Sequence, residues 1–434
     1  MNCRPAIMLA ARLVLLMAAL LLLAMLHASA ASGEETDLRL YWDKGLKLRS
    51  EDKAFRMSIG GRIQADWAAM AANSDLDEAL DAGDGGAGDP LTGFGVEFRR
   101  ARLSVQGDIY EDVYFKAQLD FAPAFDGEEV QPRDLYAGYH SALGDLTFGQ
   151  HFVPFSLEAT TSSNYITFME RSIGVDALAP SRRIGASLFN GADGRLTWQA
   201  GAFSTSEGGN EYDNEDNWFA AGRVTALPWL EDDGGRLLHL GLAYARQFAS
   251  GGNDIRYRAR PEAHLAPSRL VDTGDLDAFG SDLLGAEAAL VLGPVSLQGE
   301  YVADWVRRED GAGGDLFFQG YYAFVSWFVT GEHREYKDGV FSRVSPNENF
   351  SLADGGPGAW ELALRWSDLD LNSKDVEGGR LQDVTAGVNW HLNPNTRVML
   401  NYVHAMVRDR DSEDVVIDGR ESADIVQMRF QVDW

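Results

Sequence analysis

The chain ends in the stretch Val-Gln-Met-Arg-Phe-Gln-Val-Asp-Trp, residues 426–434, and this stretch decides the fold class. Its apolar side chains alternate strictly with polar or charged ones. This period of two predicts a β-strand with one face in an apolar environment and the other in water. About sixteen runs of this kind follow Gly33, and most are about 8–13 residues long, the length of a tilted strand that crosses a bilayer. Clear examples lie at 113–121, 295–305, 360–367 and 383–392.

The connections between these runs differ in length and charge. Gly293-Pro294 and residues 393–395 have the composition of tight turns. Residues 72–89 contain six acidic and no basic side chains, and residues 206–216 contain five acidic and no basic ones. Short turns on one side and long polar loops on the other are typical of an outer-membrane barrel, so we expect both acidic loops to face the outside of the cell.

A soluble secreted β-protein is the alternative fold. The polar faces carry charges in nearly every run, so they cannot form a packed core. The apolar faces would then have to pair as a sandwich, which so many strands would make very large. A closed barrel pairs every backbone group internally and leaves no edge exposed to lipid. We therefore predict an all-β fold, a transmembrane antiparallel β-barrel of about sixteen strands.

The first thirty residues have the layout of a secretory signal peptide. Two arginines, Arg4 and Arg12, precede an apolar core at 13–26, and small residues follow at 28–30. An uncleaved membrane anchor is the alternative, but the apolar run is short for a span of about 20 residues. We expect residues 1–30 to be removed and residues 31–434 to form one outer-membrane barrel domain. The single cysteine of the chain lies in the removed segment.

The overall charge excludes one class of partner. The chain has 66 acidic against 38 basic residues, a formal charge of -28. Nucleic-acid binding requires clustered Lys and Arg side chains to neutralise phosphates, so we expect no nucleic-acid partner. A mean hydropathy of -0.22 argues against a bundle of membrane helices. Acidic side chains in external loops would instead bind divalent cations that bridge lipopolysaccharide.

Three arginines stand close together in the stretch Phe-Arg-Arg-Ala-Arg-Leu-Ser-Val, residues 98–105. From Ala101 onward the apolar side chains occupy odd positions, which places Arg100 and Arg102 in the lumen. Before the arginines the apolar side chains occupy even positions, and this change of phase indicates either a β-bulge or the point where the strand emerges above the membrane. The pattern alone fits a functional cluster and ordinary wall charges paired with neighbouring acids equally well.

An outer-membrane hydrolase is a further possibility, because barrels can carry catalytic residues. The chain has eight histidines, and they are scattered over strands and strand ends. No nucleophile, base and orienting group stand in a recognisable arrangement. We therefore predict a protein that is not an enzyme, with no catalytic residues, cofactor or metal site.

Several motifs in order along the chain carry a resemblance to a known family. They include residues 45–48, 60–66, 98–102, 133–136, 149–158, 169–172, 330–332 and 390–395. In this order they resemble the phosphate- and polyphosphate-selective porins O and P of bacteria. The resemblance implies a sixteen-stranded outer-membrane barrel that forms a homotrimer, and a long loop that folds inward to narrow the pore. Residues 152–183, the longest connector without strand alternation, match that loop.

The resemblance also implies an anion site at the constriction. The family's arginine pair falls on Arg99 and Arg100, its aspartate on Asp134, its loop serine on Ser163 and a loop arginine on Arg171. Guanidinium groups hold phosphate through paired hydrogen bonds, and a narrow passage favours an anion whose lost water contacts are replaced.

One departure concerns lysine. Members that bind phosphate use loop lysines, whereas residues 158–164 contain none and only six lysines follow the signal segment. We expect passive diffusion of small hydrophilic solutes with a preference for anions such as phosphate or polyphosphate. A general porin without phosphate specificity and a barrel hydrolase are the alternatives.

Overall fold

The computed structural model describes residues 38–434 except 44, 87–89, 192–193, 206–217, 309–312 and 413–414. The expected signal peptide, residues 1–30, and the acidic loop at 206–216 therefore lie outside the described residues. Within the described part of the chain, no helix has the length and apolar character needed to cross a bilayer.

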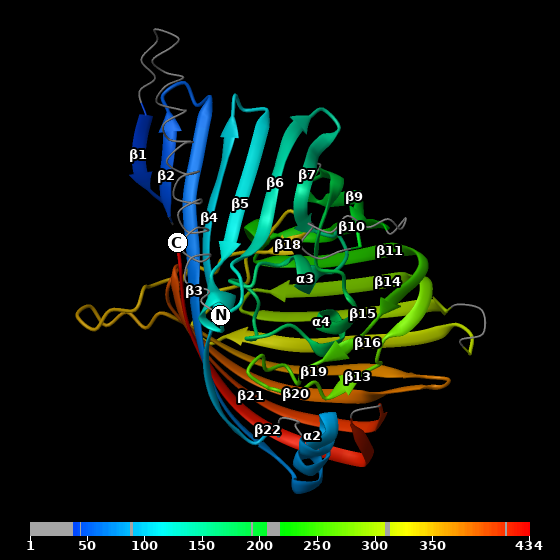
Figure 1. The fold of residues 1–434 in the computed structure, drawn as a ribbon. Coiled ribbons are helices and arrows are strands. Elements are labelled where there is room, and N and C mark those ends of the chain that lie inside the picture. The colour runs from blue at the N-terminus through cyan, green and yellow to red at the C-terminus, as the bar shows by residue number, and fades with distance from the viewer. Residues whose placement is uncertain are drawn as a thin grey trace.

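The described residues form a closed antiparallel barrel of sixteen strands, as the sequence predicts (Figure 1). Each strand pairs with the next in the chain, and the last pairs with the first. The barrel strands are β3 (Phe55–Ala72), β4 (Gly93–Ile109), β5 (Val113–Asp120), β6 (Gln131–Ser141), β7 (Gly144–Phe152), β8 (Arg182–Asn190), β9 (Leu196–Ser204), β10 (Trp218–Glu231), β11 (Arg236–Ile255), β14 (Leu276–Leu292), β15 (Val295–Arg308), β16 (Leu316–Phe328), β19 (Ala359–Ser373), β20 (Val376–Asn393), β21 (Thr396–Asp411) and β22 (Val416–Asp433).

The alternation in the last strand separates lipid from lumen. Val426, Met428 and Phe430 are 50%, 40% and 42% exposed, because their side chains point out of the barrel. Gln427 and Arg429 point inward, where lumen contents bury them. The period of two in the sequence therefore marks the two faces of the barrel wall.

The last strand closes the barrel on the first. β22 pairs with residues 62–72 of β3, and the terminal Trp434 continues the ladder. Its backbone N–H donates to the carbonyl of Gly61 at 3.1 Å, and its own carbonyl accepts from the N–H of Gly61 at 3.0 Å. The pairing that closes the barrel therefore extends as far as Trp434.

A hairpin in front of the barrel extends the wall beyond this seam. It consists of β1 (Leu38–Trp42) and β2 (Leu46–Ser50). β2 pairs with residues 56–59 of β3, the part of that strand that β22 does not reach. The hairpin thus lies at the end of the barrel where the short turns are, which we call the turn end.

Contrary to what the sequence predicts, short turns and long loops do not separate fully between the two ends of the barrel. At the turn end, residues 110–112, 293–294 and 394–395 are short, but the connection 329–358 is long. It contains the small strands β17 (Tyr336–Lys337) and β18 (Val340–Phe341). At the opposite end, which we call the loop end, the connections after β19 and β21 are short instead.

The acidic segment 72–89 is mostly a helix rather than a polar loop. Asn73 accepts a hydrogen bond from the backbone of Leu76 at 3.3 Å, at the start of α2 (Ser74–Gly86). Leu76 and Leu80 stand four residues apart, are buried, and help to pack α2 against β22. Because most other side chains of this segment are acidic or small, the sequence predicted a polar loop and not a helix.

Other short elements lie in the remaining connections. These are η1 (Ala122–Phe125), η3 (Asp232–Gly234), α3 (Leu157–Thr160), α4 (Ile173–Leu178), β12 (Arg258–Ala259) and β13 (Val271–Asp272).

The expected inward loop runs from 153 to 181, between β7 and β8, and carries α3 and α4 inside the ring of strands (Figure 1). α4 contacts β15, β16 and β19, far across the barrel from its own strands. Gly174 makes this approach possible, since a Cβ there would lie 2.9 Å from the backbone of Gly320. The loop therefore crosses the lumen and fills the side lined by β15–β19.

Candidate functional site: an arginine-lined passage

A polar cavity of about 540 Å³ lies between the inward loop and the wall formed by β3 and β4. All five residues expected at the constriction line it: Arg99, Arg100, Asp134, Ser163 and Arg171. Ten basic side chains line this cavity against four acidic ones. The basic ones are Arg62, Arg99, Arg100, Arg102, Lys116, Arg133, Arg171, Arg182, Arg260 and Arg269.

The arginine pair reaches the lumen through a bulge in β4. The pairing with β3 places Arg100 opposite Gln64 and Phe98 opposite Ala65, so Arg99 is the extra residue. A bulge lets two successive side chains turn to the same face of a sheet. The change of phase in the sequence at these arginines is therefore this bulge.

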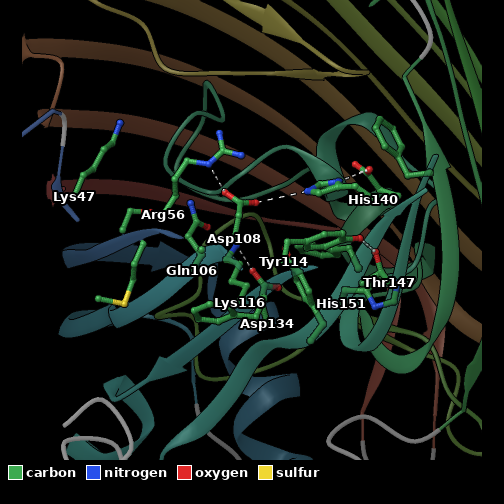
Figure 2. Close-up of a pocket in the computed structure, with 18 of the residues that line it drawn as sticks. Lys47, Arg56, Gln106, Asp108, Tyr114, Lys116, Asp134, His140, Thr147 and His151 are labelled. Atoms are coloured by element: carbon green, nitrogen blue, oxygen red, sulfur yellow. Dashed lines mark hydrogen bonds and ion pairs between the residues drawn. The ribbon is translucent and has the colours of Figure 1, made fainter. Parts of the chain in front are cut away.

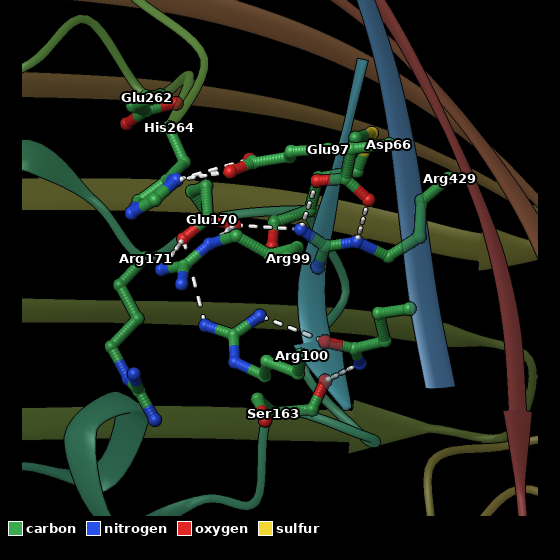
Figure 3. A network of polar contacts seen from close by, with 12 residues as sticks. Asp66, Glu97, Arg99, Arg100, Ser163, Glu170, Arg171, Glu262, His264 and Arg429 are labelled. Carbon is green, nitrogen blue, oxygen red and sulfur yellow. Dashed lines mark hydrogen bonds and ion pairs between the residues drawn. The ribbon is translucent and has the colours of Figure 1, made fainter. Parts of the chain in front are cut away.

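The carboxylate of Glu170, on the inward loop, binds at the arginine pair Arg99 and Arg100 (Figure 3). Arg99 donates two hydrogen bonds to Glu170, from Nε and Nη2, both at 2.9 Å. Arg429 of β22 donates to the same carboxylate at 2.7 Å, and Arg100 lies 3.7 Å from it. Burial would raise the pKa of Glu170, but the charges of Arg99, Arg100 and Arg429 outweigh burial and hold it well below its usual range.

A second group of cations surrounds Asp134, nearer to the turn end. Asp134 accepts from Arg182 Nε at 2.5 Å and pairs with Lys116 at 2.6 Å. Arg102 pairs with Asp120 at 2.7 Å on the neighbouring strand. Each of these guanidinium groups keeps donors besides the one used by its aspartate.

The inward loop also contacts β3, through Ser163. Its hydroxyl accepts a hydrogen bond from Arg62 of β3 at 2.7 Å. Arg171 is used differently, because it donates to backbone carbonyls of the loop itself, at Glu158 and Ala159 with 3.0 Å each. The side chain of Arg171 therefore braces the loop as well as lining the cavity.

Sequence reasoning missed several residues of this cavity. Glu170, Arg62 and Arg182 line it, and Arg182 pairs with Asp134. Arg429 and its partner Asp66 lie beside it and extend the ion pairs of Glu170. The alternation places Arg429 in the lumen, but no local pattern shows which loop residue it meets. Glu170 stands in a motif that resembles the family, next to Arg171, and was still not identified.

A second cavity, of about 670 Å³, opens at the turn end (Figure 2). Lys116, Asp134, Phe152 and Thr160 line both cavities, so the two adjoin at these residues. The guanidinium of Arg182 lies 3.8 Å above the ring of Phe152 at this junction. The lumen beside β3–β8 thus contains two adjoining cavities, which together we call the passage, whereas loop segments fill the side toward β15–β19.

Side chains that bind metal ions are not clustered among the described residues. These residues include no group of three or more His, Cys, Asp or Glu side chains placed to hold a metal ion. His239 is fully buried and contacts Glu287 at 2.9 Å and Tyr336 at 2.7 Å. This arrangement fits an internal contact between the wall and the segment 329–358.

Comparison with known proteins identifies the family. The model of the phosphate-selective porins O and P matches residues 68–434. An uncharacterized protein of Caulobacter vibrioides is 32% identical over 371 residues, which are 83% of this chain and 70% of that one. Porin O of Pseudomonas aeruginosa is 26% identical over 423 residues, which are 89% and 91% of the two chains.

Solved structures agree on the fold. The anion-selective porin from Comamonas acidovorans superposes with a TM-score of 0.56 at 16% identity, over 88% of this chain and all of that one. The outer-membrane channel DcaP of Acinetobacter baumannii gives 0.55 at 10% identity, over 89% and 99%. Family and fold are those of a channel rather than an enzyme. The chain belongs to the porin O and P family and is a porin of the bacterial outer membrane.

Proposed function

We propose that the passage conducts small hydrophilic anions, with phosphate or polyphosphate among them. The observation that carries this proposal is the contrast in charge. Ten basic and four acidic side chains line the cavity at the inward loop, although the whole chain has a formal charge of -28. A narrow cavity with low-dielectric walls focuses the field of its own lining, so the local excess of cations governs which ions enter.

Arginine favours oxyanions within this class. A guanidinium presents donors in a planar fork that matches two oxygens of phosphate or carboxylate, whereas a lysine acts as a point charge. Nine of the ten basic residues at the cavity are arginines. Arg99, Arg100, Asp134, Ser163 and Arg171 are the residues that we propose to act at the constriction, with Arg62, Arg102 and Arg182 beside them.

Planar-bilayer recording tests the proposal. In a potassium chloride gradient the reversal potential should show preference for chloride, and added phosphate should reduce the chloride current. Arg100→Ala should weaken both effects while conductance persists. Arg236→Ala, which removes an exposed arginine at a turn, is the matched control and should change neither. Cation preference in the unaltered protein, or a current indifferent to phosphate, would contradict the proposal.

The assembly that we propose is a homotrimer. β5–β9 have 8–11 residues each, while the other barrel strands have 13–20. The wall formed by β5–β9 is therefore shorter than the rest of the barrel, and its outer face carries exposed apolar side chains such as Leu135, Phe148 and Trp198. Such a face suits contact with another protomer better than contact with a bilayer of full thickness. Cross-linking in membranes at a cysteine placed at Phe148, with a trifunctional maleimide that takes one thiol from each protomer, should give trimers if this wall is the interface.

At the loop end, the exposed carboxylates of α2 suit the proposed contact with lipopolysaccharide. Asp75, Glu78 and Asp81 lie on the exposed face of the helix. Divalent cations could join them to lipid phosphates, and chelation should then weaken the contact.

A further inference from the structure

The cavity at the turn end differs in character from the arginine-lined one. We call it the ring vestibule; Tyr114, Tyr136, His140 and His151 form one side of it. Its volume of about 670 Å³ is in the usual range for a site that holds a small organic molecule. Three basic side chains line it, Lys47, Arg56 and Lys116, and so do three acidic ones, Asp108, Asp134 and Asp145. A bare inorganic anion therefore finds no excess of positive charge here.

The rings form a continuous patch across three neighbouring strands. Tyr114 of β5 lies 4.6 Å from His140 and 6.2 Å from Tyr136, both on β6, measured between ring centroids. Tyr136 in turn lies 6.0 Å from His151 of β7. Ring faces of this kind bind the apolar face of another ring, whether aromatic or saturated.

The patch is held rigidly before any solute arrives. The ring of Tyr114 packs closely against Gly138, where a Cβ would come within 2.1 Å of the ring. Its hydroxyl also makes a hydrogen bond of 2.7 Å with Thr147 (Figure 2). A site whose side chains are already fixed loses little conformational entropy on binding.

The acidic side chains of the ring vestibule indicate which substituents a bound solute ring should carry. Asp145 lies 2.7 Å from Nδ1 of His140, and Asp108 contacts both Arg56 and the far nitrogen of the same histidine (Figure 2). An ionised carboxylate has about four lone-pair positions, so each aspartate can still accept from a solute hydroxyl. Carboxylates repel a simple anion and an aromatic acid, but they suit a ring that bears hydroxyl groups.

We propose that the ring vestibule binds a cyclic polyol that carries a phosphate group, that is, a sugar monophosphate. The sugar ring packs against Tyr114 and Tyr136, whose rings stand nearly perpendicular to each other. Its hydroxyls donate to Asp108 and Asp145, and its phosphate is held by Lys116 at the junction with the arginine-lined cavity. This inference rests on the proposed passage of anions, and it names an organic phosphate as a solute of the same route.

The test compares three solutes on the chloride current: glucose 6-phosphate, inorganic phosphate and glucose. Glucose 6-phosphate should block at a concentration at least about tenfold lower than glucose, because only the phosphorylated sugar uses both cations and rings. Tyr136→Leu should raise the concentration of glucose 6-phosphate needed for half block by about five- to tenfold, the effect of one lost ring contact. The block by inorganic phosphate should stay within about twofold, because its site lies elsewhere.

Matched variants keep the result interpretable. Tyr139→Leu removes an aromatic ring from the outer face of the same strand and should not change the block. Tyr114→Phe keeps the ring and should retain most of it, whereas Tyr114→Leu repeats the test if the Tyr136 variant does not insert. An equal effect of Tyr136→Leu on both phosphates, or no effect on either, overturns the proposal. A missing anion preference in the salt gradient would instead overturn the proposed function, and it is measured without any sugar.

Discussion

Glu170 shows how one side chain can set the strength of a binding site. It belongs to the inward loop, yet it makes with Arg99 the paired contact that an oxyanion solute would make. Arg429 of β22, two strands away from β4 in the same wall, holds the same carboxylate. A solute anion at these arginines must compete with a ligand that is tethered to the protein.

Removing this charge should strengthen anion binding. In Glu170→Gln, Arg99 and Arg100 lose their internal carboxylate, and we expect phosphate to block at a concentration about tenfold lower, together with a larger chloride preference. Current block and reversal potentials in bilayers measure both. Asp176→Asn, a second acid at the same cavity, is the control and should have a smaller effect. Unchanged block in Glu170→Gln would show that solute anions bind elsewhere.

The low pKa of Glu170 leads to an expectation about pH. A carboxyl group whose pKa is depressed by folding keeps its contacts above the unfolded value of about 4.3 and loses them only as pH falls through the lower folded value. Anion preference should therefore stay constant between about pH 7 and pH 5 as far as this group is concerned. Reversal potentials across that range check this, and a step that disappears in Glu170→Gln would contradict it.

At the scale of elements, strands were easier to predict than the segments between them. Alternation shows each strand locally, as in 295–305, because lipid and lumen impose a period of two. The acidic helix α2 was missed, since only Leu76 and Leu80 indicate its buried face. The contacts of the inward loop were also beyond prediction, because they join residues far apart in sequence, such as Glu158 and Arg365.

Arg365 fixes two loops at once. From β19 it donates to Glu158 of the inward loop at 3.0 Å and to Glu262 of the segment 256–275 at 3.1 Å. A third bond of 3.0 Å reaches the backbone of Glu170. All three acceptors are on segments that enter the lumen from the loop end. This one guanidinium therefore links the two segments to each other and to β19.

Loss of Arg365 should loosen the lumen while the barrel persists. In Arg365→Met two buried carboxylates lose their cation, which costs about 3–5 kcal/mol. We expect larger and noisier single-channel conductance and faster proteolysis within 153–181. Arg236→Met breaks a solvent-exposed pair with Asp232 at the turn end and should have little effect. Equal conductance in the two variants would mean that the loops are held without Arg365.

At the scale of the whole molecule, net charge and local charge have opposite signs. The count of -28 excludes nucleic acid but says nothing about selectivity, because the cavity lining is mainly basic. The alternation of strands predicted the closed barrel and the family motifs placed five residues at one cavity. No sequence pattern revealed that the filled lumen leaves a passage beside β3–β8, since this depends on how three separate segments pack together.

Salt should weaken the anion preference. Fixed charges act over about 10 Å at 0.1 M salt and about 3 Å at 1 M, so chloride in concentrated salt is screened from most of the arginines. The permeability ratio of chloride to potassium should fall between these concentrations, as measured from reversal potentials at a constant gradient ratio. A ratio independent of salt would indicate selection by direct contact alone, without a contribution from the wider field.

The seam between β22 and β3 also has a consequence for biogenesis. It joins residues that are about as far apart in the chain as two residues of the barrel can be, and such pairings form late and slowly. Until Trp434 reaches Gly61, the sheet has two bare edges that can pair with any other extended chain. An unclosed chain is therefore exposed to such pairing, and removal of its last strand should leave a chain that aggregates or is degraded.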